Sequence, residues 1–139
     1  QALKDNKNGH INSYDIWNDQ YWSTQENCQN EINEWGVQDY VTLTHMDFYD
    51  WIKTDEEFDF LYFDIDNDGD KLLKLYEHTK FQVKNGSIIL FEGGSEERDK
   101  YILEGTTKIN DVKDTVDYTL LTNDIKYCVS GIWNKEIYR

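Results

Sequence analysis

Short apolar segments alternate with amphipathic segments along this chain, and the spacing of their hydrophobic residues predicts strands and helices in turn. Runs rich in β-branched and aromatic residues, bounded by polar turns, are typical of strands. Hydrophobic residues three and four positions apart predict the helices between them. The predicted strands are residues 10–17, 40–47, 58–65 and 87–92, and the predicted helices are residues 23–35, 70–82 and 95–103.

The first of these long helices carries capping signals at both ends. Ser23 and Glu26 have the spacing of a capping box, which predicts that the helix begins there. Gly36 is expected to end it in a left-handed conformation. The side chains expected on its buried face are Cys28, Ile32 and Trp35.

The order of these elements predicts the fold class. Strands that alternate with helices predict a parallel sheet covered by helices. The nearly continuous apolar run at 87–92 predicts a strand that is covered on both faces. Residues 118–122 and 126–133 flank Asn123-Asp124 and predict a closing hairpin. We therefore expect an α/β fold with a mostly parallel sheet, helices on both faces and a C-terminal antiparallel hairpin.

Carboxylates lie at the end of each predicted strand. Asp15 and Asp47 lie near the ends of the first two strands, Asp64 and Asp66 come at the end of the third, and Glu92 ends the fourth. Right-handed crossovers bring the carboxyl ends of parallel strands to one edge of the sheet. Ligands of open α/β sheets bind at that edge. The sequence therefore predicts a site built from these acids.

The densest cluster of acids lies in residues 58–70, which read FDFLYFDIDNDGD. Asp64, Asp66 and Asp68 have the alternate spacing of a calcium-binding loop, in which carboxylates reach one ion. The match fails further on, because Leu75 occupies the twelfth position, where a bidentate Glu is needed.

Two other interpretations fit the same acids. Asp64 and Asp66 resemble the carboxylate pair with which metal-dependent glycosyltransferases hold a divalent ion on a nucleotide diphosphate. Alternatively, Asp68 and Asp70 begin the following helix, where carboxylates oppose the positive end of the helix dipole. For Asp68 and Asp70 we prefer this second interpretation.

The composition narrows the classes of partner. The formal net charge of −14 at pH 7 repels phosphate backbones and anionic membrane surfaces, so we expect neither nucleic acid nor a membrane as a partner. Cys28 and Cys128 lie outside any CxxC spacing and are expected to be reduced thiols, which favours a cytoplasmic location. The expected partner is a small-molecule substrate, and a homodimer is left open.

Taken together, these segments resemble the class I S-adenosylmethionine-dependent methyltransferases, of the small-molecule O-methyltransferase kind. The segment FDFLYFD, ending at Asp64, has the form of the family's fourth strand, and KNGSIILFE has that of its fifth. The terminal hairpin also fits, because the family adds an antiparallel last strand. The resemblance implies a Rossmann-like fold and methyl transfer from S-adenosylmethionine to a small-molecule acceptor.

The resemblance also implies a cofactor site. In the family, the acid that ends the second strand holds the cofactor ribose, and Asp15 occupies that position. A carboxylate there can accept hydrogen bonds from both ribose hydroxyls. A turn after the next strand lies against the adenine, and Asp64 matches the acid beside the transferred methyl group. The cofactor-binding residues implied in this way are Asp15, Ile16, Trp17, Met46, Asp47, Phe48 and Asp64.

Three acids are the expected catalytic residues. Asp64 or Asp66 is expected to orient or deprotonate the acceptor, with assistance from Glu92. Asp64 and Glu92 also match two positions that hold the ion in metal-dependent members, so a divalent cation, Mg²⁺ or Ca²⁺, is left open. The chain departs from those members at two positions, since Gly93 replaces an Asn and Asn67 replaces the lysine base.

The family's glycine-rich first turn is absent and would lie upstream of Gln1. We therefore expect residues 1–139 to be a single methyltransferase-like domain, truncated before its first strand and its glycine-rich turn. Two alternatives stay open. One is a metal-dependent nucleotide-sugar glycosyltransferase that uses Asp64-x-Asp66, and the other is a non-catalytic Rossmann-like domain.

Overall fold

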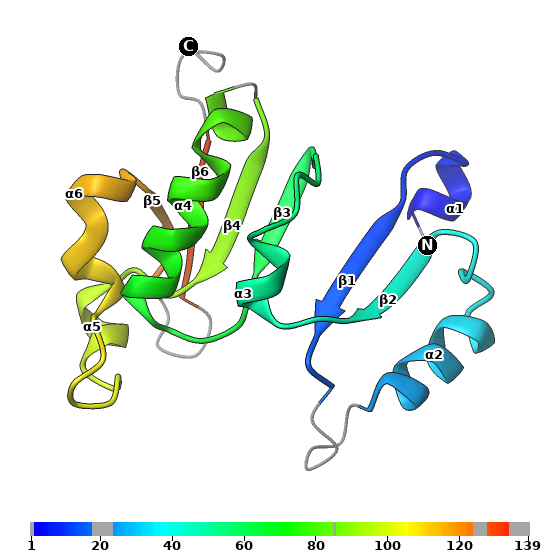
Figure 1. Cartoon of the computed structure of the whole chain (residues 1–139), viewed down its shortest axis with the longest axis horizontal. Coiled ribbons are helices and arrows are strands. Elements are labelled where there is room, and N and C mark those ends of the chain that lie inside the picture. The colour runs from blue at the N-terminus through cyan, green and yellow to red at the C-terminus, as the bar shows by residue number, and fades with distance from the viewer. Residues whose placement is uncertain (1, 18–23, 85, 124–127, 134–139) are drawn as a thin grey trace. The chain divides into compact units, whose positions relative to one another are not determined.

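The computed structural model describes residues 2–17, 24–84, 86–123 and 128–133, with the backbone alone at 81–84. The chain forms two compact units, unit 1 at residues 1–54 and unit 2 at residues 55–139. Each unit contains its own sheet (Figure 1).

Unit 1 is built on a pair of parallel strands. Its elements in chain order are α1 (Ala2–Asn6), β1 (Ile11–Asp15), α2 (Gln25–Glu34), β2 (Val41–His45) and α3 (Phe48–Trp51). β1 and β2 pair in parallel over their whole length, from Ile11 opposite Val41 to Asp15 opposite His45. A parallel pair needs a crossover between its strands, and α2 lies in that crossover.

The ends of α2 confirm one predicted cap and correct another. Gly36 has a φ of +62°, which confirms the left-handed end. The N-cap is Thr24, whose hydroxyl accepts a hydrogen bond from the Asn27 N–H, whereas Ser23 lies outside the described residues. Trp35 is 69% exposed, so its predicted place on the buried face is wrong. It follows the last helical residue and forms the C-cap.

Aromatic side chains form the core of unit 1. Phe48 and Trp51 of α3 are each only 7% exposed. The ring of Trp51 packs against that of Tyr14 on β1, with centroids 6.3 Å apart. Asp47 is the N-cap of α3 and accepts a hydrogen bond from the Tyr49 N–H. This cap begins α3 shortly after the end of β2. Phe48 and Trp51, three positions apart in the helix, lie on its buried face.

Unit 2 contains a mixed four-stranded sheet. Its strands are β3 (Phe60–Phe63), β4 (Ile88–Glu92), β5 (Thr119–Thr122) and β6 (Val129–Ile132), in the spatial order β3-β4-β6-β5. β3 and β4 are parallel, while β6 pairs antiparallel with both β4 and β5. The helices are α4 (Gly69–Lys84), α5 (Glu96–Asp99), the 3₁₀ helix η1 (Ile109–Val112) and α6 (Lys113–Val116).

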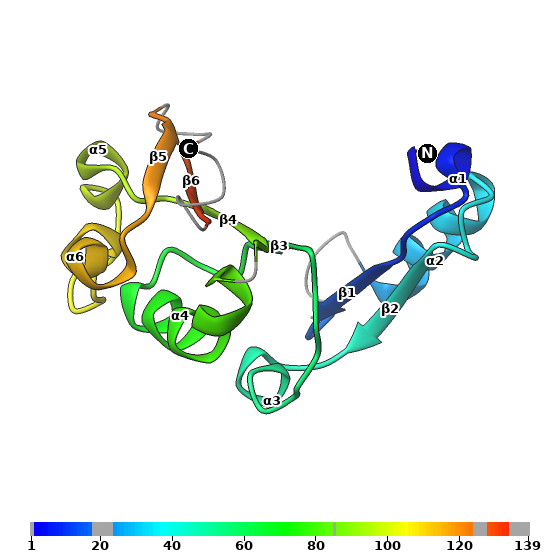
Figure 2. The same cartoon turned by 90° about the horizontal axis from the view of Figure 1, so that it is seen from above.

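The core of unit 2 lies between α4 and one face of this sheet (Figure 2). Leu72 and Leu75 of α4 are fully buried, as are Ile89 and Phe91, whose side chains share a face of β4. The opposite face of the β3–β4 pair is less covered, since Phe60 and Tyr62 are 56% and 51% exposed. Full coverage of both faces, as expected from the apolar run at 87–92, is therefore confirmed on one face only.

The predicted elements agree with the described ones in type and order, which confirms a mixed α/β chain with a closing antiparallel hairpin. The helix predicted at 95–103 is shorter and covers only Glu96–Asp99. Parallel pairing is confirmed within each unit, while a single continuous sheet stays a prediction. In the part of the chain that the structure describes, no helix is long and apolar enough to cross a membrane.

Two glycines with similar backbone angles test the packing of unit 2. Gly94 has a φ of +97° and Gly105 a φ of +88°, so alanine strains the backbone at either position by about 1 kcal/mol. A Cβ at Gly94 would also meet the Ser130 hydroxyl and lie 2.7 Å from the ring of Tyr118, whereas no atom lies within 4 Å at Gly105. We expect Gly94→Ala to destabilise the chain by a further ~1–3 kcal/mol, seen as a lower midpoint of urea unfolding. Equal midpoints for Gly94→Ala and Gly105→Ala would contradict this packing.

Candidate functional site

β3 and β4 place two carboxylates at the same edge of the sheet in unit 2. Because the strands are parallel and Phe63 lies opposite Phe91, Asp64 and Glu92 are the next residues along each strand. Asp64 is exposed, while the side chain of Glu92 is 26% exposed. The structure therefore brings together two of the three predicted catalytic acids.

Tyr62 of β3 is affected by both of these charges. Burial raises the pKa of its phenol above the ordinary value, and the negative charges of Asp64 and then Glu92 raise it further. Each carboxylate disfavours the negative phenolate. Tyr62 precedes Asp64 by two residues, so the two side chains lie on one face of the strand, and this spacing is the signal that the sequence offered for it.

Glu92 forms an ion pair with Arg98, with 2.5 Å between its Oε1 and the guanidinium Nη2. The chain can return over the end of β4 because Gly93 and Gly94 have φ values of +107° and +97°. Ser95 then caps α5 by accepting a hydrogen bond from the Arg98 N–H. The short spacing from Glu92 through two glycines and a serine cap to Arg98 is the sequence signal for this pair.

Asn67 connects this ion pair to the acidic turn, by which we mean residues 64–68. In the amide orientation that satisfies both neighbours, its nitrogen donates to the Glu92 carbonyl at 3.3 Å. Its oxygen then accepts from Arg98 Nη2, also at 3.3 Å. Gly93 has to be glycine here, because its φ is +107° and a Cβ would lie only 2.6 Å from the Asn67 side-chain amide. Asn67 and Gly93, two departures from the metal-dependent methyltransferases, thus lie in contact.

The other acids of the turn have partners of their own. Asp66 forms an ion pair with Lys71, on the first turn of α4. Asp68 accepts a hydrogen bond from the Asp70 N–H at 2.9 Å and directly precedes the first residue of α4. This confirms the interpretation in which Asp68 and Asp70 begin a helix.

In unit 1, Asp15 and Trp17 form a compact turn at the end of β1. The Oδ1 of Asp15 accepts a hydrogen bond from the Trp17 N–H at 2.9 Å, and Trp17 has a φ of +47°. The indole N–H donates to the Thr44 carbonyl at 3.4 Å, so the ring reaches across to β2. Ile16, between them, is 51% exposed.

The predicted residues after β2 lie beside this turn. The Met46 N–H donates to the Asp15 carbonyl at 3.0 Å, which joins the ends of the two strands. Asp47 is exposed and caps α3, while Phe48 is buried in the core of unit 1. The structure therefore groups Asp15, Trp17, Met46 and Asp47. The expected gathering of these residues with the acids of unit 2 stays a prediction.

The described residues give little support to a metal site. Among them, no group of three or more His, Cys, Asp and Glu side chains could hold an ion. Glu92, one of the two acids expected as ligands, is bound to Arg98. A guanidinium competes with a cation for the same carboxylate oxygens.

Comparison with known families places this geometry in context. A family model described as "Methyltransferase domain" matches residues 1–92 of the 139-residue chain. The match covers the strands from β1 to β4 and so includes Asp15, Asp47, Asp64 and Glu92. None of the curated proteins matches the chain. The family match favours the methyltransferase interpretation over a glycosyltransferase.

Asp64→Asn is expected to lower the pKa of Tyr62 toward its ordinary value, because the substitution removes one of the negative charges that raise it. The pKa can be followed through the ¹³Cζ chemical shift of Tyr62 in an NMR titration at alkaline pH. Asp114→Asn, which changes an exposed acid on α6, is the matched control and should leave this pKa unchanged. An unchanged or higher pKa in Asp64→Asn would contradict the described site.

Proposed function

The chain belongs to the family of methyltransferase domains, and we propose that it transfers a methyl group from S-adenosylmethionine to a small-molecule acceptor. The observation that carries the proposal is the grouping of acids at the carboxyl ends of parallel strands, within the segment that matches the family. Open α/β folds bind their ligands at such ends.

The turn after β1 fits the adenosine part of the cofactor. One oxygen of Asp15 accepts from the Trp17 N–H, and none of the described residues donates to the other. That second oxygen can accept hydrogen bonds from ribose hydroxyls. The indole of Trp17 offers a flat apolar surface on which an adenine can stack. Asp47, at the end of the neighbouring strand, would lie near the base.

The acids of unit 2 are the proposed acceptor-facing groups. When bound, the cofactor supplies a methyl group whose bond to a positively charged sulfur breaks as the acceptor's lone pair attacks. The acceptor loses one proton in this exchange, and a carboxylate within hydrogen-bonding distance can take it. Holding the acceptor in position would supply most of the rate.

Asp64 is the best placed of the three acids to take that proton. Asp66 is paired with Lys71, and Glu92 is paired with Arg98. Asp64 is exposed and forms no ion pair with the described residues. We propose that Asp64 receives the proton, while Glu92 holds Arg98 and Asn67 in place at the end of β4. No divalent cation is part of this proposal.

Calorimetry with S-adenosylhomocysteine, the product form of the cofactor, tests the proposal on the full chain. We expect saturable binding that Asp15→Asn weakens about tenfold or more, because a hydrogen bond to a charged group is lost. Asn keeps an oxygen that can accept from the Trp17 N–H, so the turn itself should persist.

Asp39→Asn is the matched control, because Asp39 is an exposed acid of unit 1 that precedes the amino end of β2. It should bind S-adenosylhomocysteine as the unsubstituted chain does. The proposal would be contradicted by absent binding, or by equal weakening in Asp15→Asn and Asp39→Asn.

A further inference from the structure

A buried carboxylate closes the loop that follows α5. Asp99, the last residue of α5, is only 4% exposed. Its Oδ2 accepts a hydrogen bond from the Asn110 N–H at 3.0 Å, which joins the end of α5 to η1. The chain between these two residues, 100–108, is referred to below as the 100–108 loop. Closure of this loop therefore depends on the Asp99 side chain.

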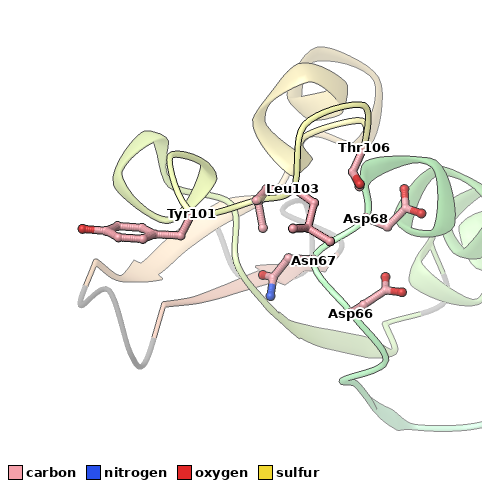
Figure 3. Close-up of a pocket in the computed structure, with 7 residues that line it drawn as sticks. Asp66, Asn67, Asp68, Tyr101, Leu103 and Thr106 are labelled. Carbon is pink, nitrogen blue, oxygen red and sulfur yellow. The ribbon is translucent and has the colours of Figure 1, made fainter.

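The tip of the 100–108 loop is held by little packing. Leu103 and Tyr101 are 81% and 67% exposed. A cavity of about 230 Å³ lies between the loop and the acidic turn, and the ring of Tyr101 points away from that turn (Figure 3). The loop is instead attached at its C-terminal end, where the Gly69 N–H donates to the Thr107 carbonyl at 2.8 Å and Ile109 is buried. The contacts at the two ends of the loop therefore hold it in place.

The Asp99 carboxylate lacks a partner that a buried charge requires. Among the described residues, none donates a hydrogen bond to its Oδ1, which is buried. Burying a charged group is costly unless the charge is paired, so this environment favours the neutral acid. In the neutral acid, Oδ2 still accepts from the Asn110 N–H, while the proton resides on Oδ1. Protonation thus keeps the bond that closes the loop and removes the buried charge.

The titratable groups around Asp99 come from η1, from the residue before η1 and from the residue before β5. Burial raises the pKa of Asp99 above its ordinary value of 3.8, and the hydrogen bond from Asn110 lowers it. The negative charge of Asp111 raises this pKa, while the positive charge of Lys108 lowers it. Burial, and then the charge of Asp99, raises the pKa of the Tyr118 phenol, so the phenol is uncharged at neutral pH. Burial is the largest of the effects on Asp99, and the net direction is upward.

We propose that Asp99 is a pH-sensitive latch for the 100–108 loop. In its protonated form it binds the Asn110 N–H without a buried charge, and the loop stays closed. In its ionised form the buried negative charge favours opening, because opening exposes the carboxylate to water. The latch controls the position of Tyr101 and Leu103, which the loop carries. It does not rest on the proposed function, and its test needs no cofactor.

Proton linkage gives the direction of the pH effect. The closed loop binds the Asp99 proton more tightly than the open loop, in which the carboxyl has its ordinary pKa of 3.8. The closed form is therefore favoured most below the pKa of the open form, and this advantage is lost as the pH rises through the pKa of the closed form. Between the two pKa values, the equilibrium constant for opening rises by up to about tenfold per pH unit, and above the higher value it levels off.

Two NMR measurements on the full chain test the latch. A pH titration of the ¹³Cγ shift of Asp99 gives the pKa of the closed form, which we expect above 3.8. Hydrogen exchange, corrected for the intrinsic rate at each pH, gives the protection of the Gly69 and Asn110 amides. We expect this protection to fall as the pH rises, by a total factor equal to ten raised to the difference between the two pKa values. A pKa at or below 3.8, or protection that does not fall, would overturn the proposal.

Asp99→Asn removes the titrating group and keeps the shape of the latch. Its side-chain amide has an oxygen that can accept from the Asn110 N–H, but it does not ionise. We expect the protection of the Gly69 and Asn110 amides in this variant to lose its fall with pH. Asp114→Asn, at an exposed acid of α6, is the matched control and should keep the fall of the unsubstituted chain. An equal fall in both variants would overturn the proposal.

The amides of β4 show whether the loop opens by itself. We expect them to be protected about tenfold or more above the Gly69 and Asn110 amides, because exchange in the core requires unfolding of the whole unit. Equal protection would mean that the loop opens only when unit 2 unfolds, and would overturn the latch. If Asp99→Asn does not fold, the titration and the exchange of the unsubstituted chain still decide the proposal.

Discussion

The parallel pairing of β3 with β4 is the constraint on which the arrangement of unit 2 depends. It aligns Phe63 with Phe91, so Asp64 and Glu92 leave the sheet at one edge. Partial burial raises the pKa of Tyr62 there, and the negative charges of Asp64 and Glu92 raise it further, because they disfavour a third negative charge. Arg98 compensates one of them through its ion pair with Glu92. The core behind this edge, where α4 covers β4, keeps the strands in register.

Glycines allow the chain to come back over this edge. Gly93 and Gly94 have positive φ values, and a Cβ on either would collide with a neighbouring side chain. The Tyr118 hydroxyl donates to the Gly94 carbonyl and the Ser130 hydroxyl to the Gly93 carbonyl, both at 2.8 Å, so the turn is held from β6 and from the start of the hairpin. At Gly69, the same absence of a side chain lets the loop at residues 100–108 approach α4. The positions of Arg98 and Leu103 both follow from these turns.

Periodicity and turn residues predicted the strands and the helices α2, α4 and α5, because those signals act locally. The same signals predicted that Asp68 and Asp70 begin α4. They failed at Trp35, which has helical spacing but lies at the C-cap, where the chain turns away from the core. They also placed the end of α5 too late, since the chain turns after Asp99, and the Asn110 N–H then donates back to the Asp99 carboxylate.

The sequence predicted which acids form the candidate site, but it did not predict which residues pair with them. Acids at strand ends are visible in the sequence, and the resemblance assigned roles to Asp15 and Asp64. The pairing of Glu92 with Arg98, and of Asp66 with Lys71, depends on where the chain returns in space. The contact between Asp99 and Asn110 has no periodic signal either.

The central claim is that the carboxyl ends of β1 and β2 bind the adenosine part of a methyl donor. The most direct measurement maps the backbone amide shifts of the ¹⁵N-labelled chain on addition of S-adenosylhomocysteine. We expect the largest shifts in unit 1 to fall at residues 15–17 and 46–48. Shifts confined to the amino ends of these strands, near Ile11 and Val41, would contradict it.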